Sequence, residues 1–155
     1  IILRFPRSGV HCIDGNALKS HCAQYILPIA VAHGGIEVAD LFIDRRLTDT
    51  AVAELAKRTT VIADDELNKL FPDYYASIVQ ISTKAGATLE RRSDIARGYP
   101  ETALSEDELD AKFRGLAGSV ASSWRVDSLS DCLNGLENAP DVSELASLLT
   151  GRPDP

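Results

Sequence analysis

The most informative segment of the chain, residues 19–35, is KSHCAQYILPIAVAHGG. Its apolar residues recur at helical spacing, which predicts one amphipathic helix that Asn16 or Ser20 caps. Gly34-Gly35 supplies a left-handed stop. Pro28 removes a backbone donor inside the helix, so we expect the surrounding structure to hold the helix in place. The segment opens with a cation, a hydroxyl and an imidazole in consecutive residues.

Length and composition are those of a globular protein. The 155 residues, 45% hydrophobic and 25% charged, suffice for one domain or for two small pieces of a larger one. No run approaches the roughly 18 apolar residues of a membrane span, and no signal peptide is visible. Because the chain begins with Ile1 instead of Met, we expect it to begin within a longer protein.

Charge is distributed unevenly. The net charge of −7 argues against a nucleic-acid partner, which would need a cationic face. Residues 1–33 nevertheless hold Arg4, Arg7 and Lys19 against Asp14 alone, together with all three histidines. A cationic, histidine-bearing segment in an acidic chain suits a small anionic ligand. The alternative, that these cations are solvated and cluster by chance, stays open.

Cysteine usage favours a cytoplasmic protein without a cofactor. Cys12, Cys22 and Cys132 are odd in number and widely spaced, and no C-x-x-C pair occurs. Neither a zinc site nor a cysteine-ligated cluster is expected, and no His, Asp or Glu group has ligand spacing. Reduced thiols in the cytosol are the simplest account. We therefore expect no stoichiometric iron or zinc.

The first hundred residues mix strands and helices. Strands are predicted at 1–5, 59–63, 77–83 and 88–95, the last two forming an antiparallel hairpin around Gly86. A second helix follows Asp49 or Thr50, and residues 64–66 are predicted to be a solvated acidic turn. A small antiparallel sheet with two helices on one face is the expected result.

The rest of the chain is predicted to be helical. Ser105 and Glu108 form a capping box that begins one helix. Two shorter helices follow near 129–136 and 142–149, the last capped by Asp141 and stopped by Gly151 and Pro153. The expected class is α+β, with domains at 1–100 and 101–155. Three short amphipathic helices would leave apolar surface uncovered, which points to a partner in cis or in trans.

Three segments resemble, in order, motifs of the MmgE/PrpD family. Gln24–Ala32 resembles the family's motif of Phe or Tyr followed by Ser-Leu-Pro-Tyr-Ala-Val-Ala. Residues 79–86 resemble its hairpin, and residues 98–113 resemble its passage of Gly-x-Pro, Pro-Leu-Ser-x-x-Glu-Leu and Lys-Phe. The chain departs from the first motif at Ile26 and Ile29, where the family often has Ser and Tyr. This departure leaves the exact substrate open.

The resemblance implies a position within a longer enzyme. Family members have a large helical domain built from both ends of the chain and a smaller α/β lid between. The present chain would be the back part of the lid followed by helices that return to the large domain. Most of the family's catalytic residues lie in the earlier part. An N-terminal helical domain would therefore be needed, in cis or in trans, and the complete enzyme is expected to be a homodimer.

The resemblance also implies a reaction class. The family includes 2-methylcitrate dehydratase of propionate metabolism, cis-aconitate decarboxylase and iminodisuccinate epimerase. Their chemistry passes through a carbanion- or enolate-like species beside a carboxylate, which requires cations, a base and an acid. The expected function is the C-terminal part of a lyase or isomerase acting on a small polycarboxylate. A carbon–oxygen lyase resembling 2-methylcitrate dehydratase is the specific expectation.

His21 is the predicted catalytic residue. It holds the place of a family histidine three residues before the glutamine of this helix, here Gln24. A solvated or core histidine is the alternative. The predicted substrate-binding residues are Lys19, Ser20, Gln24 and Tyr25, although packing is also a sufficient explanation for Tyr25. Arg4 and Arg7 are further residues of the type that holds carboxylates.

A second class of function stays open. The chain could be a non-catalytic binding or assembly module that keeps the lid fold, or one subunit of a split enzyme. A separately encoded front part would favour the split enzyme, whereas a stable monomer without such a neighbour would favour the module.

Overall fold

The computed structural model describes residues 1–42, 46 and 48–150. Contacts divide the chain into two compact units, Ile1–Ala103 and Leu104–Pro155, called unit 1 and unit 2 below. Each unit is described by itself. The α+β class with a helical C-terminal part, predicted from the sequence, is confirmed. Within the described residues, none of the helices has the length and apolar character needed to cross a membrane.

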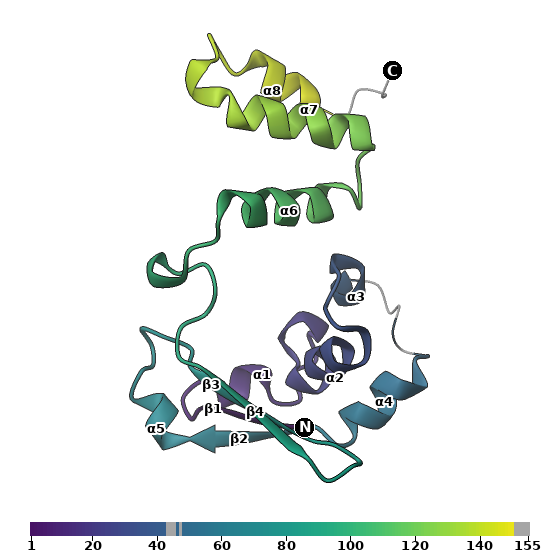
Figure 1. The fold of residues 1–155 in the computed structure, drawn as a ribbon, viewed down its shortest axis with the longest axis vertical. Helices are drawn as coiled ribbons and strands as arrows, with labels where there is room; N and C mark the ends of the chain where they lie inside the picture. Colours follow the sequence, from purple (N-terminus) through teal and green to yellow (C-terminus); the bar gives the residue numbers. More distant parts are fainter. Residues whose placement is uncertain (43–45, 47, 151–155) are drawn as a thin grey trace. The chain divides into compact units, whose positions relative to one another are not determined.

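Unit 1 is built on a four-stranded sheet in the order β2-β1-β3-β4 (Figure 1). The strands are β1 (Ile2–Pro6), β2 (Thr60–Asp64), β3 (Ser77–Ser82) and β4 (Thr88–Ser93). The predicted hairpin of β3 and β4 is confirmed. The prediction of a purely antiparallel sheet is wrong, because β1 pairs with β2 in parallel. The long helical connection between these strands permits the parallel crossover.

That crossover contains the segment from which the sequence analysis began. It holds α1 (Val10–Ile13), the 3-10 turn η1 (Lys19–His21), α2 (Ala23–His33), α3 (Val38–Phe42) and α4 (Thr50–Ala56). Figure 1 shows α1 and α2 on one side of the sheet. A short helix, α5 (Asp65–Asn68), follows β2 directly, and the turn η2 (Pro100–Thr102) follows β4.

The expected single helix over residues 19–33 is interrupted. Cys22, with φ −98° and ψ 111°, separates η1 from α2. Neither Asn16 nor Ser20 caps α2; Cys22 is the N-cap residue and its side chain makes no capping bond. Asn16 instead accepts the Leu18 amide at 2.8 Å. The predicted stop at Gly34 is confirmed, with φ 77° and a hydrogen bond to Ala30.

Two hydrophobic clusters form the core of unit 1. Tyr25, Ile29 and Val52 join α2 to α4, while a second cluster packs α5 against β3 through Leu67, Ala76 and Ile78. Asp49 caps α4 by accepting the amides of Ala51 and Val52, which selects Asp49 over Thr50 as the predicted cap.

The acidic turn at 64–66 differs from its prediction at one residue. Asp65 and Glu66 are exposed, as expected. Asp64 is only 5% exposed, because its side chain caps α5 through the amides of Glu66 and Leu67. These hydrogen bonds, that from Leu67 foremost, lower the pKa of Asp64.

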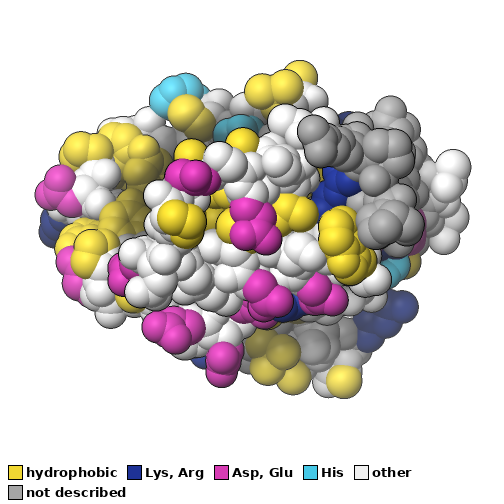
Figure 2. Space-filling view, turned by 90° about the horizontal axis from the view of Figure 1, so that it is seen from above, with side chains coloured by type: hydrophobic (Ala, Val, Ile, Leu, Met, Phe, Trp, Pro, Cys, Tyr) yellow, Lys and Arg dark blue, Asp and Glu magenta, His cyan; other side chains and the backbone are white. Residues whose placement is uncertain are grey.

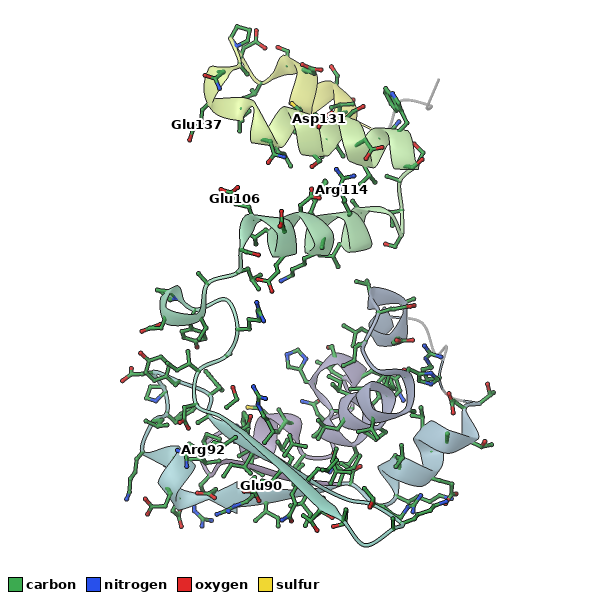
Figure 3. The ribbon with its side chains drawn as sticks, in the orientation of Figure 1. Glu90, Arg92, Glu106, Arg114, Asp131 and Glu137 are labelled. Carbon is green, nitrogen blue, oxygen red and sulfur yellow. The ribbon has the colours of Figure 1, made fainter. Side chains whose placement is uncertain are left out.

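Unit 2 consists of α6 (Glu106–Ala117), α7 (Ser123–Asn134), the turn η3 (Leu136–Asn138) and α8 (Ser143–Leu149). The predicted capping box of Ser105 and Glu108 is confirmed. Arg114 of α6 pairs with Asp110 and reaches Asp127 of α7 (Figure 3). At α8 the N-cap residue is Val142, and Asp141 accepts the Ser143 amide. Gly151 and Pro153, the predicted stop, lie outside the described residues.

Candidate functional site

Two predicted site residues line a hollow in unit 1. Ser20 and His21 stand on η1, where the interrupted helix turns toward the sheet. The hollow has a volume of about 200 Å³, and the rest of its lining is apolar: Leu3, Ile13, Ala23, Ile26 and Leu27. We call it the His21 recess. Leu3 of β1 and Ile13 of α1 complete the lining. Sequence periodicity alone did not predict that these two elements lie beside residues 19–27.

The imidazole of His21 is held on one side only. Its Nδ1 lies 2.9 Å from the hydroxyl of Ser20, a contact that either imidazole tautomer can make. No partner for Nε2 is found among the residues that the structure describes. An exposed imidazole with one nitrogen oriented and the other open is suited to proton transfer.

Lys19 and Tyr25 form one contact beside the recess. The Lys19 ammonium lies 4.8 Å from the centroid of the Tyr25 ring, a cation–π arrangement. Tyr25 is 8% exposed, and its hydroxyl donates a 2.7 Å hydrogen bond to the carbonyl of Asp40. In this structure Tyr25 therefore packs in the core, and the face of its ring contacts the Lys19 ammonium.

Gln24 connects the start of α2 to the preceding turn. Its side-chain amide donates to Asp14 at 2.6 Å, and its side-chain oxygen accepts the Gly15 amide at 3.0 Å. Gln24 is absent from the lining of the recess. The five predicted site residues thus separate into Ser20 and His21 at the recess, Lys19 and Tyr25 beside it, and Gln24 in a structural link.

Arg4 and Arg7 are both engaged by the acidic turn. Arg4 lies 2.5 Å from Asp64, while Arg7 makes a two-pronged pair with Asp65 at 2.6 and 2.9 Å. The hydrogen bond that Arg7 donates to Asp65 lowers the pKa of Asp65 and raises the pKa of Arg7. The parallel β1–β2 pairing creates these contacts, since it sets Pro6 opposite Asp64. Two of the cations considered for holding carboxylates are thereby neutralised within the fold.

A buried ion pair that the sequence analysis missed lies behind Tyr25. Asp40 is 1% exposed and accepts from the Glu37 amide at 3.0 Å and from Arg46 at 2.8 Å. A buried carboxylate requires such partners because desolvation disfavours its charged form. The sequence did carry one signal for this arrangement, the short spacing between Glu37 and Asp40. An acidic side chain that accepts a hydrogen bond from a nearby backbone amide orders the start of a helix.

The described residues contain no group of three or more His, Cys, Asp or Glu side chains placed to hold a metal ion. The recess instead offers an apolar surface, an imidazole, a hydroxyl and a neighbouring ammonium. Such a set suits a small molecule that has both a hydrocarbon part and an anionic group.

The fold defines an α+β domain whose apolar recess carries an imidazole and a hydroxyl, with the Lys19 ammonium on the residue next to Ser20. The MmgE/PrpD C-terminal domain matches residues 1–134, and the chain belongs to this family. It is 31% identical over 135 residues to cis-aconitate decarboxylase of Homo sapiens, covering 87% of this chain and 28% of that protein. The corresponding protein of Mus musculus is 30% identical over 138 residues, covering 89% of this chain and 28% of that protein.

A fungal relative is similar to the same degree. The cis-aconitate decarboxylase-like protein of Aspergillus oryzae is 31% identical over 129 residues, covering 83% of this chain and 26% of that protein. The chain therefore spans little more than a quarter of the length of these relatives. The predicted family is confirmed, and the names of these relatives are those of decarboxylases or decarboxylase-like proteins.

Proposed function

We propose that the chain contributes to a lyase that acts on a small polycarboxylate by proton transfer beside a carboxylate. The observation that carries this proposal is His21 at the rim of an apolar recess, with Nδ1 held by Ser20. A substrate's hydrocarbon part would occupy the recess, and its reacting carbon would face the open Nε2. A substrate carboxylate nearby would favour the protonated imidazole, as an opposite charge does.

Each predicted residue has a distinct proposed role. His21 delivers or removes the proton, Ser20 orients the imidazole, and Lys19 attracts a carboxylate. Tyr25 supports Lys19 through its ring, while Gln24 holds the turn at Asp14 and Gly15 in place. Charge-assisted hydrogen bonds from the ammonium are the stronger contacts in such a site.

The relatives' names favour decarboxylation of cis-aconitate over dehydration of 2-methylcitrate as the reaction. Both reactions develop negative charge beside a carboxylate, so the same cation and acid would serve either. We infer the class of substrate that the two reactions share, a small tricarboxylate. A comparison of turnover on cis-aconitate and on 2-methylcitrate decides between decarboxylation and dehydration.

The proposed partner is an N-terminal helical part of the same family, in cis or in trans, with a homodimer as the complete enzyme. The chain covers about a quarter of its relatives, which supports a requirement for further residues. A cytosolic location agrees with the three free cysteines.

The test compares the chain alone with the chain joined to a matching front part from a family member. The chain alone should give no turnover on cis-aconitate or 2-methylcitrate, and the joined protein should be active. In the joined protein, His21→Ala should lower turnover about a hundredfold or more, as expected for one acid–base group. Full activity of that variant would refute the assignment and make Lys19 the better candidate.

Two variants separate chemistry from folding. His11→Ala removes another exposed histidine of unit 1 and should leave turnover unchanged. Tyr25→Phe keeps the ring beneath Lys19 but loses the hydrogen bond to Asp40. A lower midpoint of unfolding with unchanged kcat would show that this hydroxyl is structural, whereas reduced kcat with intact folding would show that it contacts substrate.

A further inference from the structure

A second hollow of unit 1 lies where β4 leads into η2. It has a volume of about 390 Å³ and is lined by Arg91, Ser93, Ile95, Arg97, Thr102 and Ala103. Two of these lining residues carry guanidinium groups, in a chain with a net charge of −7. We call this hollow the arginine groove.

Strand register places Arg91 on the same face of the sheet as the His21 recess. Leu3, which lines the recess, is the direct partner of Val79, and Val79 is the direct partner of Arg91. Directly paired residues point to the same face, and neighbouring strands lie about 4.8 Å apart, so Arg91 stands roughly 10 Å from Leu3. Arg91 of the groove and Leu3 of the recess therefore lie on one face of the sheet in one compact unit.

The acidic residues beside the groove are already engaged. Glu90 and Arg92, labelled in Figure 3, alternate with Arg91 along β4 and so belong to the opposite face. Glu90 accepts from Gln80, and Asp94 pairs with Arg92 at 2.7 Å. Arg91 itself has no ion-pair partner among the described residues. Its positive charge is thus available to an external anion.

The wall of the groove is braced. The Ser93 hydroxyl donates to the carbonyl of Ile95 at 3.1 Å, and that of Thr102 donates to the carbonyl of Ala96 at 2.6 Å. Tyr74 donates to Glu101 at 2.8 Å, which ties η2 to the segment before β3. A groove ordered in advance loses little conformational entropy when a ligand binds.

We propose that the arginine groove binds carboxylate groups of a small di- or tricarboxylate. Planar guanidinium groups match carboxylates through paired hydrogen bonds. Through Arg91, the groove would supply a carboxylate-holding cation that Arg4 and Arg7 do not, since Asp64 and Asp65 occupy those two. The inference rests on the proposed function for its class of ligand, whereas the groove itself stands on register and charge.

Binding is tested on the 155-residue chain by amide chemical shifts and calorimetry, with cis-aconitate and inorganic phosphate as probes. Cis-aconitate should give saturable shifts at residues 91–103, and Arg91→Gln should weaken binding about tenfold, the loss of one charge-assisted contact. Arg58→Gln, an equal change of charge at an exposed residue just after α4, should leave binding unchanged. Added salt should weaken binding at this exposed groove.

Three results would overturn the inference: no saturable shift at residues 91–103, equal binding by Arg91→Gln, or equal weakening by Arg58→Gln. Phosphate binding as tight as that of cis-aconitate would overturn the assignment to polycarboxylates.

In the joined protein, Arg91→Gln should raise KM and leave kcat nearly unchanged. If Arg91→Gln has no effect while His21→Ala abolishes turnover, the groove fails and the proposed function stands. If cis-aconitate binds the groove while the His21→Ala variant keeps full turnover, the groove stands and the proposed function fails.

Discussion

Units 1 and 2 bury very different amounts of their side chains. In unit 1, Ile29 and Leu67 are fully buried, and the carboxylates of Asp40 and Asp64 are buried with their partners. In the described part of unit 2, only Val126, Leu129 and Ser130 are buried. Many of its large apolar side chains are exposed: Leu109, Leu116, Val120, Trp124, Leu133, Leu136, Val142 and Leu149. Figure 2 shows hydrophobic side chains beside acidic ones on the face that it draws.

This difference indicates which unit maintains its own geometry. Buried apolar area is the main source of stability, so we expect unit 1 to owe more of its stability to a core than unit 2 does. Unit 2 rests mainly on local helix interactions. The two units also carry separate probes, because the single tryptophan, Trp124, lies in α7 and all four tyrosines lie in unit 1. Tryptophan fluorescence and tyrosine ring resonances therefore follow different units.

The largest expected effect is on the core of unit 1. Ile29→Ala should lower the free energy of unfolding by about 2–5 kcal/mol, because Ile29 is 0% exposed and leaves a cavity. Urea unfolding should show this loss in the tyrosine resonances and not in Trp124 fluorescence. Leu116→Ala, at a position 45% exposed in unit 2, should cost less than about 1 kcal/mol. Equal shifts of both signals would mean that the two units unfold together.

A smaller effect is expected at the start of α6. Ser105→Ala removes the acceptor for the Glu108 amide and half of the capping box, which should cost about 1 kcal/mol. The loss should appear in Trp124 fluorescence and leave the tyrosine resonances unchanged. Ser119→Ala, which removes only an exposed bond to the Leu116 carbonyl, serves as the control. A change in the tyrosine signals would contradict separate stabilisation of the units.

The smallest effect is a pH dependence that can be assigned to each unit. The pKa of Asp64 is lowered chiefly by a hydrogen bond from the Leu67 amide. The pKa of Asp110 is lowered chiefly by a hydrogen bond from the Ser130 hydroxyl. Because these folded-state pKa values lie below the unfolded value of about 3.9, the stabilisation is complete above that pH. It is lost as the pH falls through the folded-state pKa.

Two isosteric variants check this assignment by urea unfolding at several pH values below 5. Asp64→Asn keeps a capping acceptor for α5 and should make the tyrosine signals less sensitive to acid. Asp110→Asn should do the same for Trp124 fluorescence alone. An unchanged acid response in both variants would show that other carboxylates dominate.

Local sequence patterns predicted the elements whose contacts are local. The capping box of Ser105 and Glu108, the Asp49 cap, the Gly34 stop and the hairpin around Gly86 each depend on residues a few positions apart. In the candidate site, the neighbours Lys19, Ser20 and His21 were likewise identifiable from the sequence. The break at Cys22 was not, because apolar spacing continues through it while the backbone turns to meet the sheet.

The sequence by itself determined the α+β class, the helical C-terminal part and the grouping of cation, hydroxyl and imidazole at residues 19–21. Only the tertiary structure decided that β1 pairs in parallel with β2, which commits Arg4 and Arg7 to Asp64 and Asp65. It also decided that Arg91 shares a sheet face with Leu3. These contacts join residues about 60 to 90 positions apart, and side-chain periodicity carries no information about which distant strands become neighbours.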